Sequence, residues 1–111
     1  MRASVCILAL AGGLALAGPA GAADDDPIII TIKNHKFEPA EIKVPANKRL
    51  IVTVVNDDPT PEEFESKSLR IEKIIAGKSQ GAVRIGPLKP GRYGFFGEFH
   101  EATAQGAVIA E

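Results

Sequence analysis

The chain has 111 residues, a formal net charge of −1 with acidic and basic residues interspersed, and one cysteine, Cys6. A chain of this length fits one small domain and no more. The interspersed charges provide no basic face for nucleic acid, and one cysteine cannot form a disulfide framework.

The first residues have the pattern of a secretory signal peptide. Arg2 precedes an apolar run at 5–16, and small residues follow. The apolar run is shorter than the roughly 20 residues that span a bilayer and contains glycines, so a membrane anchor is disfavoured. We expect cleavage after Ala22 or Ala23, which removes a signal peptide of residues 1–23.

Residues 24–111 then form one exported domain of about 88 residues, which we expect in the periplasm. Cleavage removes Cys6, so the mature protein has neither a disulfide nor a thiolate for a metal site. No cysteine lies at a lipid-attachment box before the cleavage site, which favours a soluble protein with no direct insertion into the membrane.

Apolar side chains alternate along most of the remaining chain, which indicates β-strands. The alternating sets are Ile28, Ile30 and Ile32, then Ile42 and Val44, then Leu50, Val52 and Val54. A turn-rich stretch at 56–63 follows, and the segment "FESKSLRIEKII" at 64–75 alternates poorly. That segment is expected to form a strand with an irregular or short helical insertion.

Three more strands are predicted at 81–88, 91–96 and 106–111. About seven short strands, separated by Gly, Pro and Asn and lacking a long amphipathic helix, predict an all-β protein. The expected architecture is a Greek-key antiparallel β-sandwich.

The segment "LKPGRY" at 88–93 has the spacing of a tyrosine corner. In such a corner the hydroxyl of Tyr93 donates a hydrogen bond to the backbone of the preceding loop and fixes a Greek-key crossover. The alternative is that Tyr93 is an ordinary half-buried aromatic residue of a strand.

Three blocks of the sequence, 37–57, 88–96 and "HEATAQG" at 100–106, together resemble the cupredoxins. The resemblance covers most of the mature chain and implies the Greek-key sandwich of that family. In plastocyanin-like members the metal site contains a histidine, a cysteine, a second histidine and an axial methionine or glutamine. Two histidines and a thiolate with a weak axial ligand make a blue-copper electron carrier.

Each ligand position can be followed into this sequence through the resemblance. The second histidine matches His100, and the axial position matches Gln105. The cysteine position falls on Gly97 and the first histidine on Glu62, with Glu63 as the alternative one residue further on. Without a thiolate the protein is not expected to be blue.

The donors that remain are imidazole and carboxylate, which suit Cu(II), Fe(II), Fe(III), Mn(II) or Zn(II). Glu98 adjoins the vacated cysteine position, where its side chain could reach the gap left by Gly97. His35 in "KNHKFEP" matches a loop that lies beside the metal site in plastocyanin-like proteins. The predicted metal ligands are His35, Glu62, Glu63, Glu98, His100 and Gln105, and the predicted cofactor is a copper or iron ion.

Each of these residues also has a simpler interpretation. A loop histidine such as His35 is often only solvated, and an acidic turn such as Glu62 and Glu63 often serves solubility. The amide of Gln105 could hold the loop by hydrogen bonds instead of binding an ion, and Gly97 could be needed only for its backbone.

The blocks at 60–66 and 86–106 resemble, more narrowly, cysteine-less cupredoxin-like periplasmic proteins of bacterial iron uptake. These include the cupredoxin domain of EfeO-type proteins and the small partner encoded with Ftr-type iron permeases. The resemblance implies that the protein handles copper or iron for a membrane iron permease and assists ferrous iron oxidation or delivery.

A metal-free interaction module with the same fold is the competing interpretation. It predicts that the candidate ligands are dispersed and that an apolar surface is exposed around Phe99. A hydrolase has little support because no Ser-His-Asp or Cys-His arrangement is evident. With two histidines per chain, a homodimer that shares ligands between subunits is a further hypothesis.

Overall fold

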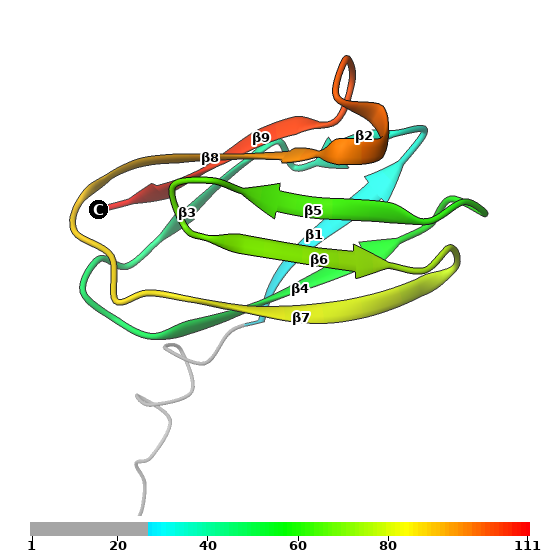
Figure 1. The fold of residues 1–111 in the computed structure, drawn as a ribbon. Helices are drawn as coiled ribbons and strands as arrows, with labels where there is room; N and C mark the ends of the chain where they lie inside the picture. The colour runs from blue at the N-terminus through cyan, green and yellow to red at the C-terminus, as the bar shows by residue number, and fades with distance from the viewer. Residues whose placement is uncertain (1–26) are drawn as a thin grey trace, which may run out of the picture.

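Two β-sheets packed face to face make up residues 27–111, the part of the chain that the computed structural model describes (Figure 1). The predicted signal peptide lies outside the described residues. The strands are β1 (Ile28–Lys33), β2 (Lys36–Glu38), β3 (Glu41–Val44), β4 (Leu50–Asn56), β5 (Glu62–Ser66), β6 (Ile71–Ile75), β7 (Ser79–Ile85), β8 (Gly91–Gly97) and β9 (Gln105–Ala110). A short 3-10 helix, η1 (Glu98–His100), joins β8 to β9.

One sheet has the order β2-β1-β4-β7 and the other the order β3-β9-β8-β5-β6. The predicted all-β sandwich is confirmed, but the sheets are mixed. β1 runs parallel to β4, and β3 runs parallel to β9. These parallel pairs form because the chain crosses between the sheets and brings distant strands side by side in the same direction. None of the helices described in residues 27–111 is long and apolar enough to cross a membrane.

The poorly alternating segment forms a hairpin and not one strand with a helical insertion. β5 and β6 pair antiparallel, with Phe64 opposite Lys73, and a turn at 67–70 joins them. Ser66 holds the turn, since its hydroxyl accepts from the Leu69 N–H (3.2 Å) and donates to a β8 carbonyl (2.7 Å). The alternation is weak because β6 lies at a sheet edge, where Ile74 is 61% exposed.

The core is formed by the inward-facing residues of both sheets. Its fully buried members are Ile30, Ile32, Val52, Val54, Phe64 and Val108, with Phe37, Ile75, Val83 and Phe95 nearly as buried. Phe37, Phe64 and Phe95 contact one another, with ring centroids 4.8 to 5.8 Å apart. Aromatic rings in such contact stabilise a core beyond the area they bury.

The predicted tyrosine corner is confirmed. Tyr93 lies on β8, and its hydroxyl donates a hydrogen bond of 2.7 Å to the carbonyl oxygen of Lys89 in the loop before the strand. The bond fixes the path of the chain into β8. The other end of β8 leads into η1 and therefore into the candidate site.

Candidate metal centre

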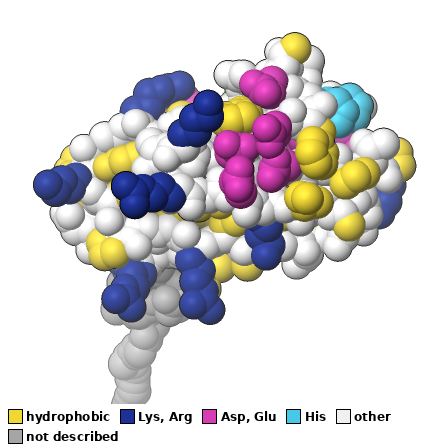
Figure 2. Space-filling model, in the orientation of Figure 1, with side chains coloured by type: hydrophobic (Ala, Val, Ile, Leu, Met, Phe, Trp, Pro, Cys, Tyr) yellow, Lys and Arg dark blue, Asp and Glu magenta, His cyan; other side chains and the backbone are white. Residues whose placement is uncertain are grey.

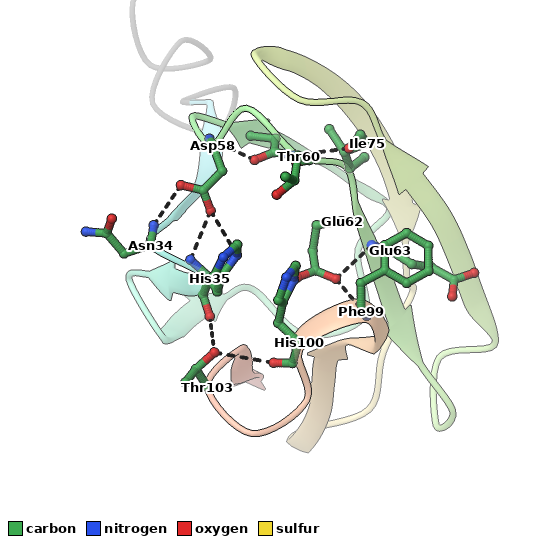
Figure 3. A network of polar contacts seen from close by, with 11 residues as sticks. Asn34, His35, Asp58, Thr60, Glu62, Glu63, Ile75, Phe99, His100 and Thr103 are labelled. Atoms are coloured by element: carbon green, nitrogen blue, oxygen red, sulfur yellow. Dashed lines mark hydrogen bonds and ion pairs between the residues drawn. The ribbon is translucent and has the colours of Figure 1, made fainter.

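Three side chains from distant parts of the sequence meet at one end of the sandwich (Figure 3). His35 lies in the turn between β1 and β2, Glu62 begins β5, and His100 ends η1. One potential ligand atom from each lies within 4.8 Å of the others. The two sheets thus both contribute to one cluster, which we call the triad.

Glu62 is the buried member of the triad, with a relative exposure of 1%. The alternation of β5 explains this, because Glu62, Phe64 and Ser66 all face inward. Its Oε1 atom accepts the backbone N–H of Glu63 (3.0 Å) and of Phe99 (2.9 Å). Its Oε2 atom lies 2.6 Å from Nδ1 of His100. A buried carboxylate is tolerated when its oxygens are hydrogen-bonded in this way.

The carboxylate of Glu62 lies directly against the backbone of Gly97. A Cβ atom at Gly97 would be 2.6 Å from Cδ of Glu62 and 2.8 Å from Cβ of Ala104. Glu98 was predicted to reach the gap left by Gly97, but Glu62 fills that gap. Glu98 is exposed because η1 begins there and turns the chain away from the strand direction.

His35 is held by its backbone. Asn34 and His35 form the turn with φ angles of 54° and 59°, and their N–H groups donate to the two oxygens of Asp58 at 2.8 and 2.9 Å. Oδ2 of Asp58 also lies 3.5 Å from Nδ1 of His35. Burial raises the pKa of Asp58, but the two N–H donors and the charges of His35 and Lys78 together outweigh it and hold that pKa below its usual value.

The hydroxyl of Thr103, in the loop after η1, donates to the carbonyl oxygen of His35 at 2.6 Å. This bond links the His35 turn to the segment that carries His100. Figure 3 shows the same connection between the two loops. The turn that holds His35 and the segment that holds His100 are thus joined by this hydrogen bond.

The two imidazoles are stacked, with centroids 3.6 Å apart and planes inclined by 13°. The side chains of His35 and His100 are 43% and 28% exposed, so the triad opens to solvent, and Figure 2 shows histidine at the edge of the molecule. Metal bonds to imidazole lie in the ring plane at about 2.0 Å. An ion midway between stacked rings would lie well outside both planes, so binding one ion through both rings requires one ring to tilt.

A second group of carboxylates lies on the outer face of the five-stranded sheet, the one that contains β5 and β6. Its members are Glu63, Glu65, Glu72 and Glu98, whose oxygens lie within 4.8 Å of one another, and acidic side chains gather on this face in Figure 2. We call this group the outer cluster. A hydrogen bond with Glu98, burial and neighbouring charges raise the pKa of Glu63 to about 7. Burial and Glu98 also raise the pKa of Glu65, whose Oε1 atom is buried without a hydrogen-bond partner.

A family model of the cupredoxin-like domain matches residues 6–110. The chain belongs to the cupredoxin-like domain family. This domain is 46% identical over 80 residues to the uncharacterized protein RP394 of Rickettsia prowazekii (strain Madrid E), a match that covers 72% of this chain. The same match covers 64% of the relative, so this chain spans less than two thirds of the relative's length.

Solved structures of amicyanin are similar in fold to this cupredoxin-like domain. Amicyanin from Paracoccus versutus (Thiobacillus versutus) has a TM-score of 0.62 and 20% identity, covering 78% of this chain and 82% of that chain. An amicyanin variant described as Cu(I) has a TM-score of 0.64 and 19% identity, covering 77% and 82%. At identities this low, the structural similarity shows the sandwich fold alone.

The six predicted ligands of this cupredoxin-like domain lie in three separate places. The triad brings His35, Glu62 and His100 together, whereas Glu63 and Glu98 belong to the outer cluster. Gln105 is exposed, and its amide donates to the carbonyl oxygen of Glu101 at 2.8 Å, as the loop-holding alternative predicts.

Asp58 contacts His35 and was missed in the sequence. A signal was present, because "NDDP" at 56–59 is rich in residues that accept backbone hydrogen bonds in turns. The pattern shows that a turn forms there, but it does not show which distant N–H groups the side chain meets.

The donors of the triad fit a first-row transition metal. Two imidazoles and a carboxylate suit Cu(II), Zn(II) or iron, and the solvent-exposed edge gives an ion access. No cysteine occurs in residues 27–111, so this part of the chain supplies no thiolate and the triad cannot form a blue-copper centre.

Proposed function

We propose that this cupredoxin-like protein is an exported metal-binding protein with a non-blue centre at the triad. The observation that carries the proposal is the convergence of His35, Glu62 and His100, whose potential ligand atoms lie within 4.8 Å. Three residues of metal-binding type, two histidines and a glutamate, come from separate segments and meet where both imidazoles reach solvent. The alternation of β5 explains why Glu62 faces inward, but it does not explain why two histidines from other segments lie beside it.

The ion we propose is copper or iron. Imidazole and carboxylate donors favour Cu(II), Fe(II) and Fe(III) over Cu(I), which prefers thiolates and thioethers. The amicyanin neighbours, one of which is described as Cu(I), support copper. Because residues 27–111 contain no thiolate, we favour an ion harder than Cu(I).

The narrower proposal is that the protein serves an iron-uptake permease from the periplasm. It is supported by the resemblance of residues 60–66 and 86–106 to the periplasmic proteins of bacterial iron uptake. The exposure of His35 and His100 also supports transfer of an ion to a partner. The protein would then deliver iron or assist the oxidation of ferrous iron as an accessory component.

Isothermal titration of the metal-free mature protein with Cu(II), and with Fe(II) under argon, tests the proposal. We expect one ion to bind per chain and binding to be lost in the double variant His35→Ala, His100→Ala. Gln105→Ala is the matched control, because its amide bonds only a backbone carbonyl in its own loop. Glu98→Gln shows whether any residual binding belongs to the outer cluster.

The alternative, a metal-free interaction module, is favoured by one observation. Phe99 lies beside the triad and is 47% exposed, although its N–H group is bound to Glu62. Titrations that show no binding of either ion by the wild-type protein would contradict the metal proposal. Phe99 would then be the first residue to substitute in a search for a protein partner.

A further inference from the structure

Each imidazole of the triad has a carboxylate behind its Nδ1 atom. Glu62 lies behind His100, and Asp58 lies behind His35. Both carboxylates are buried, and each comes from a different segment than its histidine. Because the atom that carries the ring hydrogen is set by the partner of the other nitrogen, these contacts decide which nitrogen is free to bind an ion.

For His100 the assignment follows from the hydrogen bonds of Glu62. Oε1 of Glu62 already accepts two backbone N–H groups, and Oε2 lies 2.6 Å from Nδ1 of His100. A carboxylate that already accepts two N–H groups is set up as an acceptor, so this short contact favours the hydrogen on Nδ1. The free lone pair of the ring is therefore on Nε2.

For His35 the partner is Asp58. Its oxygens accept the N–H groups of Asn34 and His35, and Oδ2 lies 3.5 Å from the ring Nδ1. The N–H of Asp58 donates to Oδ1 of Asn56 (3.0 Å), whose amide is held in turn by two backbone carbonyls. A fixed negative charge at this distance favours the ring hydrogen on Nδ1, which again leaves Nε2 free.

We infer that Glu62 and Asp58 are positioning residues that hold His100 and His35 as their Nδ1–H tautomers, so that the centre presents two Nε2 lone pairs. Within the triad, Glu62 then acts through His100 and is not itself a ligand, so the two histidines are the ligands that the triad offers to an ion. A carboxylate behind a ligating imidazole orients the ring and raises its basicity. The role in binding an ion rests on the proposed function, whereas the tautomers are a property of the metal-free protein.

Long-range proton–nitrogen NMR of the metal-free protein, at a pH where both rings are neutral, tests the tautomers directly. We expect hydrogen on Nδ1 in both rings. Asp58→Asn should change the tautomer population of His35 only, and Glu62→Gln that of His100 only. Asp57→Asn is the matched control, because it removes the same charge at the neighbouring exposed position. Hydrogen on Nε2 of either ring in the wild-type protein would overturn the inference.

Zn(II), which is diamagnetic, serves as the probe for ligation. We expect the nitrogen resonances of both Nε2 atoms to shift on loading, and Asp58→Asn to weaken Zn(II) binding by about 10- to 100-fold. Asp57→Asn should bind Zn(II) as the wild type does. Ligation through Nδ1 of either ring, or an unchanged affinity in Asp58→Asn, would contradict the positioning role.

The two proposals can fail separately. If the wild-type protein binds none of Zn(II), Cu(II) and Fe(II), the proposed function is wrong, and the NMR spectra of the metal-free protein still decide the tautomers. If ions bind but the rings carry hydrogen on Nε2, the function stands and the role given to Glu62 and Asp58 is wrong.

Discussion

Glu62 and Glu63 are neighbours on β5, yet they belong to two different groups of carboxylates. Glu62 faces inward and is surrounded by hydrogen-bond donors, two from the backbone and one from His100. Glu63 faces outward and lies among Glu65, Glu72 and Glu98, which only accept when ionised.

The difference between the triad and the outer cluster shows what makes a carboxylate costly in a protein. Glu62 is the more buried, but all its close polar contacts are donors. Glu63 is more accessible, and its pKa is raised to about 7 because its neighbours are also acids. For Glu63 the hydrogen bond with Glu98 is the main cause of the raised pKa, and burial and the charges of the other acids add to it. Substitutions that change either the triad or the outer cluster, and leave the other unchanged, test this difference.

The largest effect is expected from Gly97→Ala, which acts on the triad. The added Cβ would lie 2.6 Å from Cδ of Glu62, so the carboxylate must move and lose hydrogen bonds. We expect about 1 to 3 kcal/mol of lost stability in urea unfolding, together with weaker metal binding. Gly94→Ala on the same strand is the control, since its nearest neighbour would be 3.9 Å away. Equal stabilities of the two variants would contradict the close packing of Glu62 on Gly97.

Glu62→Gln should have an intermediate effect. The amide keeps the shape and can still accept the two backbone N–H groups, but the charge-assisted bond to His100 is lost. We expect a loss of about 1 kcal/mol in unfolding free energy, because bonds to charged groups are stronger than neutral ones. Glu63→Gln, the same change one residue further on, should stabilise the protein above pH 7. If both variants changed stability in the same direction at that pH, the contrast between the two groups would be wrong.

The smallest effect is a pH dependence that comes from the outer cluster. The pKa of Glu63 is about 7 in the folded protein and ordinarily near 4.5, so between these values the folded chain binds more protons than the unfolded one. Its contribution to stability is therefore complete below pH 4.5 and is lost as the pH rises through 7. Glu98→Gln removes the first cause of the shift and should flatten this decline in urea unfolding between pH 4 and 8. Glu101→Gln should not, and a decline that persists unchanged in Glu98→Gln would rule out the coupling.

Much of the fold could be predicted because each strand has its own alternation of apolar residues. Ile30 and Ile32 on β1 and Val52 and Val54 on β4 are buried as the pattern predicts. The parallel pairing of these two strands could not be predicted, because alternation indicates which face is buried but not which strand lies alongside. β6 was obscured since an edge strand buries fewer residues.

The candidate site could be predicted in part. That His100 and Glu62 lie together could be predicted, because both occupy ligand positions in blocks that resemble the family. Glu98 was predicted to lie next to the vacant position at Gly97, but the direction of its side chain depends on η1, which begins at that residue. The contact between Asp58 and His35 depends on two turns meeting from different strands, which no local pattern reports.

Thr103 joins the His35 turn to the segment that carries His100 by one hydrogen bond, and a bound ion would join them a second time. His35 and His100 belong to different sheets and lie far apart along the chain, and residues 27–111 contain no cysteine. An ion shared by the two rings would close a long loop of the chain, as a disulfide does. Loading would then slow the separation of the two sheets and protect the protein from proteolysis.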